Sequence, residues 1–138
     1  MDRGWWQAYH QEVESSFRGE RASLAQMPPR MQVNRLHRIK HYNNSGAAAI
    51  SLAAERGAQR ILLLGYDCQR TNGQAHWHGD HPRGLGNAGS MDKWAGSFAE
   101  LAENMRKRGV EVINCSRATA LTVFPRSDLE SELAKDAP

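Results

Sequence analysis

The chain has 138 residues, of which 40% are hydrophobic and 24% are charged; this length allows one compact domain over residues 1–138 and is short for two. It has no long apolar run and no signal-like N-terminus, so we expect a cytoplasmic protein without a membrane partner. The formal charge of +3 is low for a dedicated nucleic-acid binder, and two cysteines without a C-x-x-C pair exclude a disulfide scaffold.

The first part of the chain predicts one helix followed by two weak strands. Apolar and aromatic residues recur at helical spacing from Asp2 to about Ser16, and Gly19 then stops the helix. Residues 20–26 predict a short strand, the paired prolines of MPPR predict an extended turn, and residues 35–41 predict a charged edge strand. Nucleic-acid binding by the run NRLHRIKHY is an alternative to this edge strand, and we consider it the weaker one.

The centre of the chain predicts a helix, a buried strand, a long loop, a second helix and a second strand. Ser45 is placed to cap the first helix, Gly57 ends it, and the apolar run RILLLGY predicts a strand over residues 60–65. Residues 91–108 predict an amphipathic helix, and residues 110–114 predict the next strand. The apolar face of that second helix consists of Trp94, Phe98, Leu101 and Met105. This order is a βαβ crossover, so the two strands should be parallel.

Polar residues follow the ends of both predicted strands. Because the carboxyl ends of parallel strands share one edge, where open α/β sheets bind their ligands, we expect a ligand site there. The residues expected at this edge are Asn44, Ser45, Gly46, Tyr66, Asp67, Cys68, Asn114, Cys115, Ser116 and Arg117. The loop over residues 66–91 leaves from the same edge, and a loop of this length inside a domain is typical of a functional segment.

This loop contains HWHGDH, whose pattern H-x-H-x-D-H resembles the zinc-binding signature of metallo-β-lactamase-type hydrolases. Imidazole and carboxylate groups suit zinc, manganese or iron, and the candidate ligands are His76, His78, Asp80 and His81. Such hydrolases take further histidines from later in the chain, and no histidine follows His81 here. We therefore favour a loop without a metal, with a mononuclear metal site and a metal-dependent hydrolase as the alternatives.

A second similarity covers more of the chain. The segments NNSGAAAISLAAERGAQRILLLGYD and MDKWAGSFAELAENMRKRGVEVINCSRATAL resemble, in this order, the C-terminal half of small bacterial sialyltransferases. The similarity is closer to uncharacterised phage and prophage proteins of that superfamily, in which a loop of the HWHGDHPRGLGN type precedes NCSRATALTVFPRSDLE, whereas archaeal-type hydroxymethylpterin pyrophosphokinases are more distant. The resemblance spans about residues 43–133. It implies a Rossmann-like three-layer sandwich, with a small, mainly parallel sheet and the loop over residues 66–91 above its C-terminal edge.

The same resemblance implies a nucleotide-type ligand, for which a cytidine nucleotide donor is the candidate, and no firm cofactor. Ser45 and Gly46 match a segment that touches the donor nucleotide, and a capped helix N-terminus beside a glycine suits an anionic group. Asp2 matches a polar residue near the nucleotide. The other polar residues expected near the ligand are Asn87, Asn114, Ser116 and Arg117. A phage-encoded chain would act in the host cell cytoplasm.

The chain departs from the pattern of those sialyltransferases in two respects. Where they carry tyrosines beside the donor phosphate and a histidine base, the matching positions here are Gln69 and Asn87, which cannot perform these tasks. His78 or His81 is the candidate replacement for the base, since imidazole has a suitable pKa. The first strand and donor-cradling turn of those enzymes have no match in this sequence, so we expect an N-terminally truncated domain.

The favoured function is therefore a nucleotide-binding, glycosyltransferase-like domain that acts on a nucleotide-activated sugar or a related phosphorylated donor. Ser45, Asp67 and Arg117 are expected to bind donor groups, and His78 or His81 to remove the acceptor proton.

The alternative function is a phage accessory or structural protein that keeps the fold and works through protein contacts without catalysis. Its partner would be a second copy or another phage protein. Tryptophan is enriched at binding hot spots, and the candidate anchors are Trp5, Trp6 and Trp77.

Overall fold

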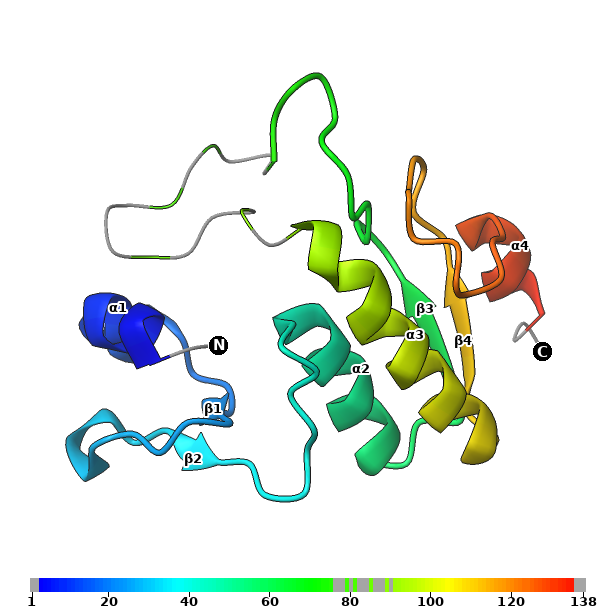
Figure 1. Ribbon diagram of the computed structural model, residues 1–138. Coiled ribbons are helices and arrows are strands. Elements are labelled where there is room, and N and C mark those ends of the chain that lie inside the picture. Colours follow the sequence, from blue (N-terminus) through cyan, green and yellow to red (C-terminus); the bar gives the residue numbers. More distant parts are fainter. Residues whose placement is uncertain are drawn as a thin grey trace. The chain divides into compact units, whose positions relative to one another are not determined.

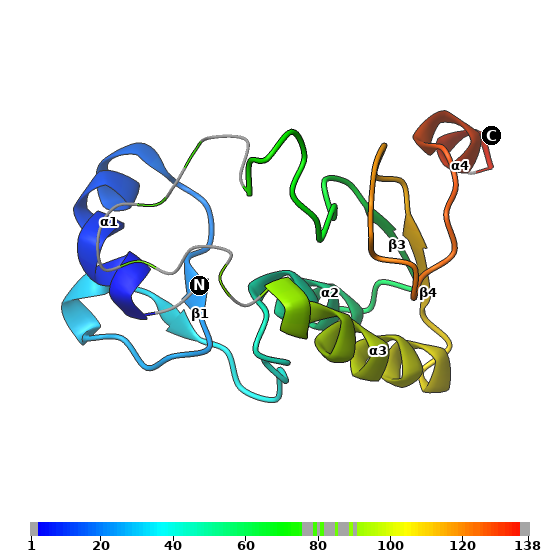
Figure 2. The ribbon, with the colours of Figure 1, turned by 45° about the horizontal axis from the view of Figure 1, so that its top comes forward.

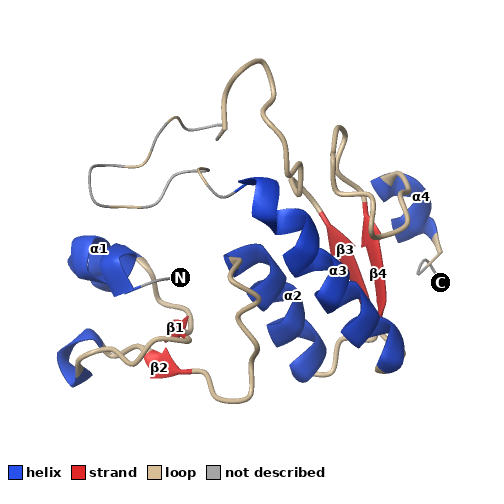
Figure 3. Cartoon of the chain, in the orientation of Figure 1, coloured by secondary structure: helices blue, strands red, loops and turns tan. Residues whose placement is uncertain are grey.

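The fold is mixed α/β with small parallel sheets, and the computed structural model describes residues 3–75, 79, 81, 85, 89 and 91–135. In chain order its elements are α1 (Arg3–Ser16), β1 (Ala22–Ser23), the 3-10 helix η1 (Pro29–Met31), β2 (Asn34–Arg35), α2 (Ser45–Glu55), β3 (Arg60–Leu63), α3 (Met91–Lys107), β4 (Glu111–Asn114) and α4 (Leu129–Ala134) (Figures 1 and 3). They belong to two compact units, an N-terminal unit from α1 to β2 and a C-terminal unit from α2 to α4. The single domain over residues 1–138 stays a prediction.

Helix α1 supplies the core of the N-terminal unit and confirms the predicted first helix over its described residues. Trp6 is 2% exposed and packs with Met27 and Met31. This corrects the expectation of Trp6 as an interface anchor, because a buried indole cannot contact a partner. Trp5 packs partly buried against the same core, with its ring edge-on to that of Trp6 at 5.3 Å. Trp77 lies outside the described residues.

The two strands of the N-terminal unit are much shorter than the sequence predicts. Strands β1 and β2 pair in parallel, and the amide of Asn34 donates to the carbonyl of Arg21 at 2.8 Å. The predicted strands over residues 20–26 and 35–41 are wrong in length. Arg38 has a left-handed backbone with a φ of 69°, which an extended strand does not allow.

The sheet of the C-terminal unit confirms the predicted parallel pair. Ile61 lies beside Val112 and Leu63 beside Asn114. Both views of the chain place α2 and α3 on one side of this pair and α4 on the other (Figures 1 and 2). Ile61, Leu63 and Val112 belong to the core with α2 and α3, whereas Arg60, on the alternate face, pairs with Glu132 of α4. Helices α2 and α3 therefore cover one face of the small sheet, and the six-residue helix α4 lies on the other.

Glycines end both long helices of this unit, as the sequence predicts. Gly57 and Gly109 have left-handed φ angles of 94° and 68°. The amides of the next residues, Ala58 and Val110, donate to carbonyls five residues back at 3.1 and 3.0 Å, which is the Schellman motif. The strand predicted to end at residue 65 stops at residue 63 instead, because the backbone of Gly65 turns with a φ of 73°.

Side chains of α3 fill the core of the C-terminal unit. Phe98 is 1% exposed, and its ring meets those of Tyr66 and Phe124 edge-on at 6.1 and 6.3 Å. Leu101 and Met105 are also buried, and Trp94 packs partly buried against the same core cluster, so the predicted apolar face of this helix is confirmed. None of the helices in the described part of the chain has the length and apolarity needed to cross a membrane.

Candidate functional site

The polar residues predicted after the two parallel strands come together where β3 and β4 end. The amide of Tyr66 donates to Oγ of Ser116 at 2.8 Å, and Oγ1 of Thr119 donates to the carbonyl of Tyr66 at 2.7 Å. The amide of Ala120 donates to the carbonyl of Asp67 at 2.8 Å. These bonds join the segment after β3 to the segment after β4, and we call residues 64–68 and 114–121 the polar edge.

Asn114 organises the polar edge from inside. Its side chain is fully buried, and Nδ2 donates to Oγ1 of Thr119 at 3.2 Å and to the carbonyl of Leu121 at 3.3 Å. Its Oδ1 accepts from the amide of Ser116 at 3.0 Å. We therefore assign Asn114 to positioning the loop rather than to direct ligand contact. The sequence reasoning did not identify Thr119, although a hydroxyl so close after a strand end is able to close a polar turn.

The N-terminus of α2 borders this region. Asn44 is its cap: it has an extended backbone with φ −150° and ψ 124°, and its Oδ1 accepts from the amide of Ala47 at 3.0 Å. The prediction of Ser45 as the cap is therefore wrong. Asparagine and serine cap helices about equally well, and the residue with the extended backbone takes the role. Ser45 is instead the first helical residue, so its amide and that of Gly46 belong to the first turn, whose amides have no acceptor within the helix.

A cavity of about 400 Å³ opens between the start of α2, the end of β3 and the first turn of α3. The lining residues that matter for its chemistry are Asn44, Ser45, Gly46, Tyr66, Asp67 and Trp94. We call it the aromatic hollow. Asp67 is the one charged residue among those that line it in the described part of the chain. The predicted ligand residues on α2 and after β3 thus share one concave surface.

Tyr66 covers Gly46 inside this hollow. A Cβ atom on Gly46 would lie 3.0 Å from Cε1 of Tyr66, and the phenol donates to the carbonyl of Gly46 at 3.2 Å. Burial, and secondarily the nearby thiol of Cys68, raise the pKa of Tyr66, so the phenol stays a hydrogen-bond donor at neutral pH. A larger residue at position 46 would therefore press against this ring.

Left-handed backbone accumulates beside the aromatic hollow at residues other than glycine. Asn43 and Cys68 line it with φ angles of 51° and 50°, and Tyr42, directly before Asn43, has a φ of 53°. The phenol of Tyr42 accepts from Nδ2 of Asn104 at 2.7 Å, which anchors the turn. Each such residue costs on the order of 1 kcal/mol, and strain of this kind clusters at ligand sites.

A second cavity, of about 780 Å³, shares Gly65 and Asp67 with the first. We call it the arginine hollow, since Arg117 and Arg126 line it. Nη2 of Arg126 donates to the carbonyls of Ser116 and Arg117 at 3.2 and 3.1 Å, so this arginine holds the loop in place. Arg117 is exposed. The other charged residues that line this cavity are Asp128 and Glu130.

The two cysteines lie at the same ends of the strands and are poor nucleophiles. Burial raises the pKa of the Cys68 thiol, and the carboxylate of Asp67 raises it further. Burial also raises the pKa of Cys115, with smaller contributions from Glu132 and Asp128. Both thiols therefore stay protonated at neutral pH.

Several predicted site residues lie outside the described part of the chain. These are Asp2, His76, His78, Asp80 and Asn87. His81 is partly buried and belongs with the N-terminal unit, whereas both hollows belong to the C-terminal unit. The catalytic histidines and the alternative metal site therefore stay predictions.

No protein-family model, curated protein or solved structure matches this chain. Its function is therefore argued from the geometry of the polar edge, since a fold by itself does not determine a function.

Proposed function

We propose that the protein is a nucleotide-binding, glycosyltransferase-like domain of the Rossmann-like type, with its ligand at the polar edge. The proposal extends to a nucleotide-activated sugar or a related phosphorylated donor as substrate. Cytidine nucleotides are the first candidates, because the sequence resembles the phage and prophage relatives of bacterial sialyltransferases.

The main support for this proposal is that the start of α2 and the ends of β3 and β4 lie close together. Parallel strands with a helical layer on each face are the setting in which open α/β sheets bind nucleotides beyond the carboxyl ends of the strands. Here that place holds two adjoining cavities, strained backbone and residues chosen from the sequence for this role. Those residues are Ser45, Gly46, Tyr66, Asp67, Ser116 and Arg117.

The proposed reaction breaks the bond between the anomeric carbon of the sugar and the phosphate oxygen of the donor. The nucleotide leaves with the electron pair of that bond, and the acceptor hydroxyl forms a new bond to the sugar while it loses a proton to a base. Arg117 would offset the charge that develops on the leaving phosphate, as an exposed cation beside the strand ends is able to do. His78 or His81 is the proposed base.

Thermal unfolding in the presence of cytidine monophosphate tests this proposal. Binding to the folded chain raises Tm with ligand concentration. Arg117→Ala should reduce this rise, whereas Arg18→Ala, the same change at an exposed arginine of the N-terminal unit, should leave it unchanged. A Tm that stays constant with cytidine, uridine, adenosine and guanosine nucleotides alike contradicts the proposal.

A further inference from the structure

The aromatic hollow has the wrong charge for a phosphate. No lysine or arginine is among its described lining residues, and its charged group is the carboxylate of Asp67. A phosphate placed there would face a like charge without a cation to offset it. The cationic groups of the site, Arg117 and Arg126, line the adjoining arginine hollow, which the carboxylates of Asp67, Asp128 and Glu130 also line.

The helix N-terminus does not compensate for this charge. Phosphate sites of this kind require a close approach to the backbone of the first helical residues, over a glycine. In this chain the ring of Tyr66 already lies over Gly46, with Cε1 3.0 Å from the position of a Cβ atom. Asn44 also uses its side chain to bind the amide of Ala47. The surface over Gly46 is therefore taken by an aromatic ring.

The side chains that line the aromatic hollow suit a ligand ring that is uncharged and carries hydroxyl groups. Trp94 and Tyr66 present aromatic surface to the cavity while they pack partly buried against the core. Asp67 offers carboxylate oxygens that accept from hydroxyl groups, and Ser45 offers a hydroxyl that both donates and accepts. Aromatic rings stack on sugars and bases, and a few polar groups then fix their orientation.

We propose that the aromatic hollow binds the uncharged, hydroxyl-bearing ring of the ligand, with Trp94 as its stacking platform and Asp67 as its hydroxyl acceptor, while the phosphate lies toward Arg117. Trp94 is the specificity-determining residue in this assignment. Two kinds of molecule carry such a ring. One is a nucleoside, with its ribose and base, and the other is a hexose. The placement of the phosphate rests on the proposed function, whereas the recognition of a neutral ring does not.

Four probes separate these contributions: cytidine, methyl glucoside, cytidine monophosphate and inorganic phosphate. Each is titrated into isotope-labelled protein, with the indole signal of Trp94 and the amide signals of Ser45 and Asp67 followed by NMR. We expect cytidine or methyl glucoside to shift these signals, and the probe that does so identifies the source of the ring. Trp94→Leu should weaken the binding of that neutral probe about tenfold, the loss expected for one stacking contact.

Arg117→Ala should leave the affinity for the neutral probe unchanged. It should lower the affinity for cytidine monophosphate by at most about fivefold, since the arginine is exposed. Trp94→Phe keeps an aromatic face and should restore part of the affinity if Trp94→Leu disturbs packing. Trp5→Leu, the matched change in the N-terminal unit, should have no effect on binding.

The outcomes distinguish this inference from the proposed function. Binding of cytidine monophosphate that is insensitive to Trp94→Leu, or a response of Ser45 to inorganic phosphate stronger than to both neutral probes, overturns the inference and leaves the function standing. Binding of methyl glucoside without any nucleotide or nucleoside overturns the function and supports the inference. Binding of none of the four probes overturns both.

Discussion

Individual side chains of the polar edge divide between those that build it and those free to meet a ligand. In the first group, the side chains form their described hydrogen bonds with neighbouring loop atoms; these residues are Asn114, Thr119 and Arg126. Asp67 and Arg117 instead present charge to the cavities. The first group should therefore affect stability when it is changed, and the second should affect binding.

Asn114→Ala is predicted to destabilise the C-terminal unit by about 2–3 kcal/mol, because it leaves the buried amide of Ser116 and the carbonyl of Leu121 without their partner. Urea unfolding measures this change. Thr122→Ala, an exposed position in the same loop, should change the free energy of unfolding by less than about 0.5 kcal/mol. Equal effects of the two substitutions would contradict the positioning role of Asn114.

Gly46→Ala is predicted to destabilise the protein by about 1 kcal/mol even though alanine favours helices, because its Cβ would press against Tyr66 and Asn44 at 3.0 and 3.2 Å. Gly96→Ala is the matched change in α3, where no atom of the described residues lies within 4 Å of the new Cβ apart from the neighbouring residues and the backbone of the helix itself. It should stabilise by about 0.5–1 kcal/mol. If Tyr66 packs over Gly46 as described, thermal unfolding will show a lower Tm for Gly46→Ala and a higher Tm for Gly96→Ala than for the unchanged protein.

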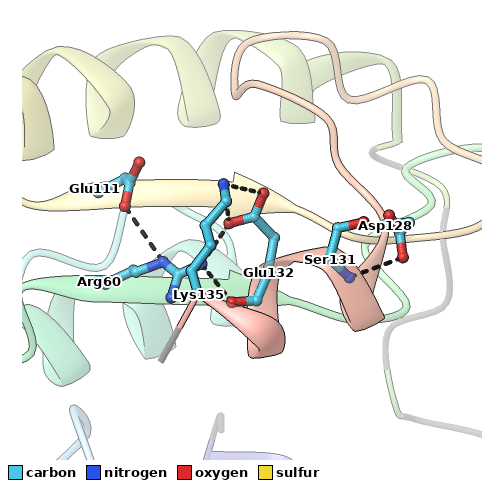
Figure 4. A network of polar contacts seen from close by, with 6 residues as sticks. All are labelled: Arg60, Glu111, Asp128, Ser131, Glu132 and Lys135. Atoms are coloured by element: carbon cyan, nitrogen blue, oxygen red, sulfur yellow. Dashed lines mark hydrogen bonds and ion pairs between the residues drawn. The ribbon is translucent and has the colours of Figure 1, made fainter. Parts of the chain in front are cut away.

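At the scale of elements, α4 is held to the sheet by a buried carboxylate. Figure 4 shows Glu132 between Lys135 and Arg60, with Glu111 of β4 at Nε of the same arginine. The Nζ of Lys135 lies 2.8 and 2.9 Å from the two carboxylate oxygens, and Nε of Arg60 lies 3.3 Å from Glu111. Hydrogen bonds from Lys135, Ser127 and Arg60 lower the pKa of Glu132 from 4.5 to about 2.

This pKa shift predicts a specific loss of stability in acid. The unfolded chain takes up the proton first as the pH falls, so the contribution of Glu132 is present above pH 4.5 and is lost as the pH falls from 4.5 to about 2. Glu132→Gln should have a lower Tm at neutral pH and a flatter dependence of Tm on pH in that range. Glu130→Gln, at an exposed position of the same helix, should follow the unchanged protein. Parallel curves for all three proteins would rule out this role of Glu132.

The strength of the local signal decided which elements could be predicted from the sequence. Helix α3 follows from apolar periodicity and β3 from a continuous apolar run, and the glycines after α2 and α3 mark where each helix ends and the next strand can begin. The short strands of the N-terminal unit depend on a few backbone bonds, and α4 has six residues, so neither leaves a clear period. The helix cap was assigned to Ser45 instead of Asn44 because the two residue types have nearly equal capping strength.

At the scale of the whole molecule, the candidate site was predictable in position but not in chemistry. Parallel strands bring their carboxyl ends to one edge whatever residues follow them, so Tyr66, Asp67 and Ser116 could be grouped from topology. Tyr66 covers Gly46, and Arg126 donates to backbone carbonyls. Both contacts depend on packing between segments that are apart in the sequence, and neither leaves a sequence pattern. These contacts distinguish the aromatic hollow, which no described lysine or arginine lines, from the arginine hollow.

An NMR titration with cytidine monophosphate is the direct test of the claim that the polar edge binds a nucleotide. We predict saturable shifts in the amides of residues 44–46, 66–68 and 116–117, with those of α1 and of the C-terminal turn of α3 unchanged. A spectrum that does not change at millimolar nucleotide, or shifts confined to residues outside these three segments, would contradict the claim.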